Sequence, residues 1–211
     1  MRFEDRRDAG RQLAAAMERY RGSDGIVLAL PRGGVVVAYE VARHLELPLD
    51  VFIVRKVGAP GDPEFGIGAV AETGAVQINQ QVIRLYGISP TYLHQEIERQ
   101  KEEIRRRQLV YRDGRSMPNL KKRTVIVVDD GIATGYTALA AVRAIWMEDP
   151  REVVLAVPVA PPEAIEQLRP EVSELVSLDT PSPFYAVGAW YTDFSQTTDD
   201  EVRSLLQAAH Q

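Results

Sequence analysis

The 211-residue sequence contains no cysteine, and its three histidines stand apart from one another, without the spacing of a zinc site. The absence of cysteine excludes disulfides, thiolate metal sites and cysteine nucleophiles, and it is compatible with a cytosolic protein. No apolar run approaches the roughly 18 residues that a membrane-spanning helix needs. The charged first residues do not precede the apolar stretch of a signal peptide. We therefore expect a cytoplasmic protein that does not associate with membranes.

The sequence also has no excess of basic over acidic residues. The formal net charge is −5, which argues against a nucleic-acid-binding surface and means that any anionic ligand must be held by a local site. The sequence has no Gly-Lys-Ser/Thr of a Walker A loop and no Gly-x-Ser-x-Gly elbow. Residues 66–71 loosely match the dinucleotide fingerprint, but they do not follow a strand pattern, so we assign no dinucleotide site to them.

Short apolar runs alternate with helical patterns along most of the chain. This alternation predicts an α/β fold with a doubly wound, mostly parallel sheet, in a single domain over residues 1–211 with a core at about 24–179. The expected buried strands are 26–30, 50–54, 124–128, 152–157 and 172–178, and the expected helices are 9–20, 35–45, 136–147 and one that starts at Pro162.

The middle of the chain interrupts this alternation. Residues 55–68 are rich in Gly and Pro, so we expect a long loop there, followed by two short strands around Gly74. Ser89 and Pro90 begin a long charged helix that runs to about residue 111. Its thin apolar stripe fits a surface helix, a lid or a dimer arm, and its basic run at 105–107 fits a solvated face.

The strand that ends at Val128 is followed by two carboxylates, a short loop of small residues and a helix. Backbone N–H groups of such a loop converge with the helix N-terminus and favour an anion. Asp129 and Asp130 can accept hydrogen bonds from the vicinal hydroxyls of a ribose that carries this phosphate. A simple acidic helix start is the structural alternative. The predicted sugar-phosphate site comprises Asp129, Asp130, Gly131, Ala133, Thr134, Gly135, Tyr136 and Thr137.

Residues 125–137 resemble the 5-phosphoribosyl 1-diphosphate (PRPP) signature of the type I phosphoribosyltransferases, and the similarity to that family extends over about 26–193. The resemblance implies that Asp129 and Asp130 hold the ribose hydroxyls and contact Mg²⁺ indirectly, through the PRPP-bound ion. It implies that residues 133–137 hold the 5-phosphate. Arg32, Gly33 and Gly34 resemble the diphosphate loop of the family, although the same residues fit an ordinary strand–helix turn.

The same resemblance suggests a catalytic loop. Arg55 and Lys56, followed by the Gly- and Pro-rich stretch, are similar to the mobile loop that closes over the diphosphate in this family. The two cations would then neutralise charge on the leaving group. A solvated strand end is the simpler reading of the pair.

Signals for the acceptor base conflict. Ala133 replaces the acid of the oxopurine branch, so the loop looks like the adenine-type version, in which a glutamate beyond the mobile loop assists the base. Glu72 then becomes the candidate general acid, or else a turn residue. Residues 184–194 instead resemble an oxopurine hood, with Tyr185 stacking on the base, Val187 beside it and Asp193 near the metal or the hood. A small aromatic core explains them equally well.

The expected C-terminal part is this hood, at about 180–196, followed by a terminal helix over about 198–208 that starts with a capping box at Thr198. No lysine in 154–160 matches the residue that reads a 6-oxo group in the family. The acceptor therefore stays open, with a purine favoured.

The sequence as a whole predicts Mg²⁺-dependent transfer of a phosphoribosyl group from PRPP to a nitrogenous base, with release of diphosphate. A PRPP-sensing regulatory or interaction protein with little turnover is the alternative, and a site for another phosphorylated sugar is a third. The resemblance also implies a homodimer, for which Ile97 and Ile104 of the long helix are the candidate contact.

Overall fold

The computed structural model of the protein describes residues 2–211. Its centre is a parallel sheet in the order β2-β1-β6-β7-β8, and the four strands other than β8 are almost wholly buried. Burial on both faces explains why these strands appear in the sequence as unbroken apolar runs. The α/β prediction is confirmed. The strands are β1 (Ile26–Ala29), β2 (Leu49–Val51), β6 (Thr124–Val128), β7 (Glu152–Val159) and β8 (Glu174–Asp179).

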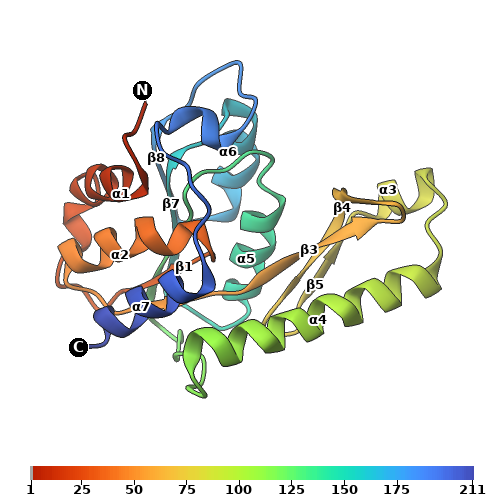
Figure 1. Ribbon diagram of the computed structural model, residues 1–211, viewed down its shortest axis with the longest axis horizontal. Helices are drawn as coiled ribbons and strands as arrows, with labels where there is room; N and C mark the ends of the chain where they lie inside the picture. Colours follow the sequence, from red (N-terminus) through yellow and green to blue (C-terminus); the bar gives the residue numbers. More distant parts are fainter. Residues whose placement is uncertain (1) are drawn as a thin grey trace.

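Helices cover both faces of this sheet, as the doubly wound prediction requires (Figure 1). One apolar core lies beneath α1, α2 and α7, and a second lies beneath α5 and α6. Short 3-10 turns complete the connections. The helices are α1 (Arg6–Ala15), α2 (Gly33–Leu45), α5 (Tyr136–Trp146), α6 (Pro162–Leu168) and α7 (Asp199–Ala209), and the 3-10 turns are η1 (Glu18–Tyr20), η2 (Arg169–Glu171) and η3 (Val187–Trp190). No helix within residues 2–211 is long and apolar enough to cross a membrane.

The expected long loop at 55–68 is wrong. This stretch forms an antiparallel hairpin of β3 (Val54–Ala59) and β4 (Asp62–Ala71), and β5 (Val76–Ile78) completes a second, three-stranded sheet. The glycines mark the hairpin turn at Gly61, with φ +75°, and a shift of strand register beside Gly58. Gly and Pro therefore signal a bulged, sharply turned hairpin here, and not unstructured chain.

A long helix braces this hairpin. After the short α3 (Gln80–Leu85), α4 (Pro90–Arg112) runs along the small sheet and returns to the main body (Figure 1). The Ser89 hydroxyl accepts the N–H of Tyr92 at the helix start, and the Tyr92 hydroxyl donates to the carbonyl of Gly58 at 2.6 Å. Ile104 is buried within the chain's own core, so it is not available as a dimer contact.

The aromatic hood has an unexpected component from the other end of the chain. Phe3 pairs in parallel with Tyr191: the Phe3 N–H donates to the carbonyl of Trp190 at 2.9 Å, and the Thr192 N–H donates to the carbonyl of Phe3 at 2.8 Å. These residues enclose a small third core. The sequence prediction placed the hood in 180–196 alone and missed this added strand.

Candidate active site

The loop between β6 and α5 is open to solvent on the side expected to face a ligand. Ala133 and Thr134 are exposed, and Gly135, with φ +86°, begins α5 in a backbone conformation that suits glycine. Gly131 lies under the hood, where an added Cβ would be 2.5 Å from the side chain of Val187. The small residues of the loop therefore serve two different purposes, a sharp turn into the helix and close packing against the hood.

The acid pair at the end of β6 is held by hydrogen bonds. Asp129 Oδ1 accepts the N–H of Asp130 at 2.8 Å. Burial, together with the adjacent Asp130 carboxylate, raises the pKa of Asp129 well above its ordinary value. The hydroxyl of Tyr191, from the hood, donates to the carbonyl of Asp130 at 2.6 Å. The hood is thus attached directly to the acid pair.

Arg6 contacts the acid pair, although nothing in the sequence indicated that it would. Its Nε donates to Asp130 Oδ2 at 2.8 Å, and its Nη1 donates to the carbonyl of Ser195 at 2.6 Å. The guanidinium also lies 3.9 Å from the ring centre of Phe194. Arg6, in α1, therefore links the hood to Asp130, a residue that is predicted to bind the ribose.

The structure places the predicted diphosphate loop against this acid pair. A Cβ on Gly33 would collide with the Asp130 carboxylate, and a Cβ on Gly34 would lie 3.0 Å from both the carbonyl oxygen of Val128 and the Cα of Asp129. Only glycine permits this approach of two backbones. Arg32 precedes these glycines as the N-cap residue of α2, with Nη1 3.9 Å from Asp199 Oδ1.

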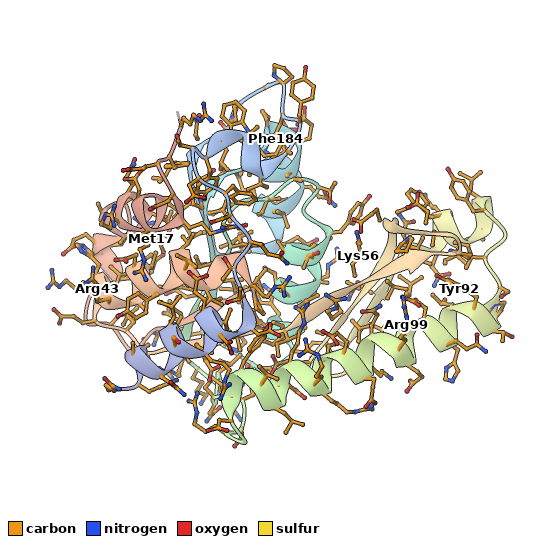
Figure 2. All side chains as sticks on the ribbon, in the orientation of Figure 1. Met17, Arg43, Lys56, Tyr92, Arg99 and Phe184 are labelled. Carbon is orange, nitrogen blue, oxygen red and sulfur yellow. The ribbon has the colours of Figure 1, made fainter. Side chains whose placement is uncertain are left out.

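Arg55 and Lys56 begin β3, near the same edge of the sheet, and face in different directions. Arg55 Nε donates to Gln100 Oε1 of α4 at 3.0 Å. Lys56, labelled in Figure 2, has its Nζ 3.1 Å from Glu64. It lines a cavity of about 530 Å³ between the hairpin and α5, together with Thr134 and Thr137. The hairpin cations therefore lie on two sides of the candidate site.

Glu72 lies in a buried ion pair. Its two oxygens accept the Ile53 N–H at 2.7 Å and Arg112 Nη1 at 2.5 Å. Arg112 also donates to Asp50 Oδ1 at 3.2 Å and to the carbonyl of Val51 at 2.7 Å. The carboxylate thus ties the end of the hairpin to the residues that follow β2 and to the end of α4.

The three hood residues predicted to bind a base occupy different surroundings. Tyr185 projects from the hood with 87% of its surface exposed, whereas Val187 packs on Gly131. Asp193 Oδ1 accepts the N–H of Ser195 at 2.9 Å, which lowers the pKa of Asp193. Asp193 therefore orders the turn that carries the Arg6 contact.

Asp129 and Asp130 are the candidate contacts for Mg²⁺ that arrives bound to a substrate. Within residues 2–211, no group of three or more His, Cys, Asp or Glu side chains is arranged to hold a metal. Mg²⁺ is commonly bound through one or two carboxylates together with substrate phosphates. Asp129 and Asp130 match that donor set once a diphosphate is present.

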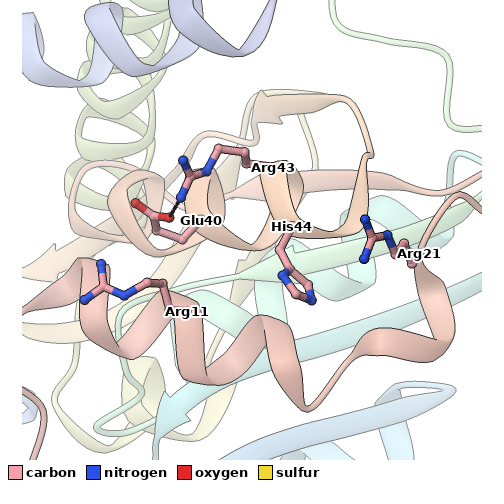
Figure 3. Close-up of a pocket in the computed structure, with 5 residues that line it drawn as sticks. All are labelled: Arg11, Arg21, Glu40, Arg43 and His44. Atoms are coloured by element: carbon pink, nitrogen blue, oxygen red, sulfur yellow. Dashed lines mark hydrogen bonds and ion pairs between the residues drawn. The ribbon is translucent and has the colours of Figure 1, made fainter.

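A separate cavity lies at the far end of α2 from Gly33 and Gly34 (Figure 3). Its basic side chains already contact carboxylates: Arg43 Nη2 is 2.8 Å from Glu40 Oε2, and His44 Nε2 is 2.6 Å from Glu18 Oε2. It shares no residue with the loop at 129–137, and we assign it no role. The lining residues are Arg11, Arg21, Glu40, Arg43 and His44.

A parallel α/β sheet with an acid pair and a phosphate-type loop after one strand, and a glycine pair after the neighbouring strand, defines a phosphoribosyltransferase-type protein. In agreement, the phosphoribosyl transferase domain family matches residues 4–189, and the chain belongs to this family.

Known relatives agree with this assignment. The chain is 44% identical over 208 residues to "Putative phosphoribosyl transferase Rv0571c" of Mycobacterium tuberculosis, a match that covers 99% of this chain and 47% of the relative. The chain thus spans about half the length of that protein. The crystal structure of TT1426 from Thermus thermophilus shares 48% identity over 99% of both chains, with a TM-score of 0.84.

Proposed function

We propose that the protein transfers the 5-phosphoribosyl group of PRPP to a nitrogenous base in a Mg²⁺-dependent reaction that releases diphosphate. One observation carries the proposal. Gly33 and Gly34, after β1, lie directly against Asp129 and Asp130, after the neighbouring β6. The reaction breaks the bond between C1 of the ribose and an oxygen of the diphosphate. The two glycines suit the diphosphate and the two carboxylates suit the ribose hydroxyls, so the two parts of PRPP on either side of this bond would lie side by side.

Each end of PRPP has a chemical counterpart in this arrangement. The N–H groups and hydroxyls of residues 133–137 suit the 5-phosphate, because they lie at the start of a helix on an exposed loop. Asp129 and Asp130 suit the ribose hydroxyls. As the C1–O bond lengthens, the electron pair stays with the diphosphate oxygen, and Arg32, Arg55 and Lys56 are placed to stabilise that charge.

When bound with PRPP, Mg²⁺ supplies further neutralisation of the diphosphate. The base nitrogen then forms the new bond to C1. We infer that the exposed ring of Tyr185 provides a stacking surface for the base. We do not assign Glu72 to its proton, because both carboxylate oxygens are engaged by Ile53 and Arg112. A purine remains the acceptor that we favour.

A PRPP-sensing protein with little turnover is the second candidate. The observation that favours it is Arg6, whose Nε already occupies Asp130 Oδ2. A carboxylate that is held by an arginine before the ligand arrives suits a protein whose state changes on binding. The two functions predict the same binding and differ only in turnover.

The deciding experiment is calorimetric titration of PRPP with Mg²⁺, on the wild type and on the Asp129→Asn/Asp130→Asn double variant. We expect binding to the wild type and its loss in the variant. A panel of bases, scored for diphosphate release, then separates the enzyme from the sensor. An intact wild type that fails to bind PRPP would overturn the proposal.

The homodimer stays a prediction. Because Ile104 is buried, we propose a different contact surface from the one that the sequence suggested. Leu85 and Tyr86, at the outer end of the arm formed by the hairpin and α4, are 77% and 63% exposed. Sedimentation velocity of the wild type and of Leu85→Asp tests this surface without disturbing the core. A wild-type monomer, or a Leu85→Asp dimer, would contradict it.

A further inference from the structure

A cleft lined by arginine lies between β3 and α4, and of its lining residues only Arg55 was predicted from the sequence to contact PRPP. Arg55 contributes from β3, and Arg99 and Arg106 contribute from α4 (Figure 2 labels Arg99). The cavity measures about 530 Å³. Gln100, Glu102 and Glu103 complete its lining.

This cleft is connected to the diphosphate loop through Asp199, in the first turn of α7. The Asp199 carboxylate accepts the hydroxyl of Tyr111 at 2.6 Å and lies 3.4 Å from Arg106 Nη1. The same carboxylate lies 3.9 Å from Arg32 Nη1. The Asp199 carboxylate therefore lies between Arg106 of α4 and Arg32 of the 31–34 loop.

Arg107 adds a further guanidinium on the inner side of α4. Its side chain is only 11% exposed, and its Nε donates to Glu103 at 3.0 Å. Glu103 also pairs with Arg106 at 2.9 Å. Arg105, the preceding residue, is 59% exposed and pairs with Glu102 at 2.6 Å. The basic run at 105–107 is therefore not a uniformly solvated face, because the helix turns one arginine outward and another inward.

Positive charge exceeds negative charge at this place. Within residues 2–211, Arg32, Arg106 and Arg107 form ion pairs with only two carboxylates, Glu103 and Asp199, while Arg55 donates to the amide oxygen of Gln100. Burial, with Arg107 and Arg32 nearby, lowers the pKa of Arg55. Like charges held together in partial burial favour an anionic ligand that supplies the missing negative charge.

We propose that Arg106 and Arg107 of α4 bind the diphosphate end of PRPP together with Arg32 and Arg55. This inference rests on the proposed function and extends its leaving-group site from the 31–34 loop to a helix that the sequence assigned to the surface. The arginines contact the diphosphate oxygens, so they stabilise the negative charge that develops there when the C1–O bond breaks.

The test uses calorimetry with two probes, diphosphate in the presence of Mg²⁺ and ribose 5-phosphate, on four proteins. These are the wild type, Arg106→Gln, Arg107→Gln and the control Arg105→Gln, which removes the same charge from the outward face of the same helix. We expect diphosphate affinity to fall by on the order of tenfold in each of the first two variants. Ribose 5-phosphate affinity, and both affinities of the control, should stay at wild-type values.

Two results would overturn the inference: wild-type diphosphate affinity in Arg106→Gln and Arg107→Gln, or an equal loss in Arg105→Gln. If Arg107→Gln does not fold, Arg107→Lys, which keeps the charge but loses the planar fork, should fold and show an intermediate loss. Failure of the proposed function looks different, since wild-type protein would bind diphosphate in this cleft but show no affinity for PRPP.

Discussion

Arg6 Nε lies 2.8 Å from Asp130 Oδ2, in a contact between residues 124 positions apart that are both mostly shielded from solvent. Asp130 is also a carboxylate that we expect to hold a ribose hydroxyl. The ligand must therefore share this oxygen with Arg6 or displace the guanidinium. Because Arg6 also donates to the carbonyl of Ser195, displacement of Arg6 would break a hydrogen bond to the hood.

Replacing Arg6 with methionine should separate these effects. We expect ribose 5-phosphate to bind several-fold more tightly, because Asp130 loses its competitor, while the free energy of unfolding falls by about 1–3 kcal/mol through loss of a charged hydrogen bond. Calorimetry and urea denaturation measure the two quantities. Weaker sugar-phosphate binding would show instead that Arg6 assists the ligand. Arg11→Met, on the same helix but away from Asp130, is the matched control.

The raised pKa of Asp129 predicts a dependence of stability on pH. In the unfolded chain Asp ionises near pH 4, whereas burial beside Asp130 keeps Asp129 protonated to higher pH in the folded protein. The folded state then binds more protons, so this residue's contribution to stability is present at low pH and is lost as pH rises above about 4. Asp129→Asn removes this loss.

The stability of Asp129→Asn relative to wild type should therefore increase as the pH rises above about 4. Urea denaturation at a series of pH values measures it. A difference that is constant across this range would mean that Asp129 titrates normally.

The buried pair of Glu72 and Arg112 predicts a structural and not a chemical role. Glu72→Gln should lower the free energy of unfolding by about 2–4 kcal/mol, because Arg112 loses one of its two carboxylate partners in a buried position. The rate of transfer per folded molecule should remain at its wild-type value. A normal stability with a lost kcat would return Glu72 to the role of general acid that the resemblance implies.

The exposed ring of Tyr185 gives a prediction about the acceptor. Tyr185→Ala should leave the melting temperature unchanged and raise KM for the base several-fold, since a stacking contact contributes about 0.5–1.5 kcal/mol. Met147→Ala, which removes another exposed apolar side chain at the end of α5, should change neither. Steady-state kinetics with the base as the varied substrate measures the effect. An unchanged KM in Tyr185→Ala would place the base elsewhere.

Sequence reasoning recovered the main sheet and the β6–α5 loop because their signals are local. A buried strand such as residues 124–128 is recognisable from consecutive apolar side chains, and the loop that follows carries its acids and glycines in one short stretch. The hairpin at 54–71 was missed because its glycines and Pro63, which serve a turn and a bulge, conceal the alternation of a strand.

The arginines that shape the site could not be found in this way. Arg6 and Arg112 contact carboxylates 124 and 62 positions away, and nothing in the surrounding residues distinguishes them from solvated arginines. Arg107 differs from Arg105 only in the direction that α4 gives it, which depends on how the helix lies against the hairpin. Side-chain burial of this kind is set by tertiary packing.

The pairing of Phe3 with Tyr191 has a consequence for how the protein is made. The contacts that attach the N-terminal segment to the hood pair Phe3 with Tyr191 and Arg6 with Ser195, so they have nearly the largest sequence separation that this chain allows. During synthesis on the ribosome, the sheet can begin to form before the hood residues have been made. Phe3 then stays unpaired until Tyr191 has left the ribosome. Contacts between residues so far apart in the sequence form late in folding. A nascent chain stalled before residue 190 should therefore have a folded core with an unfinished ligand site.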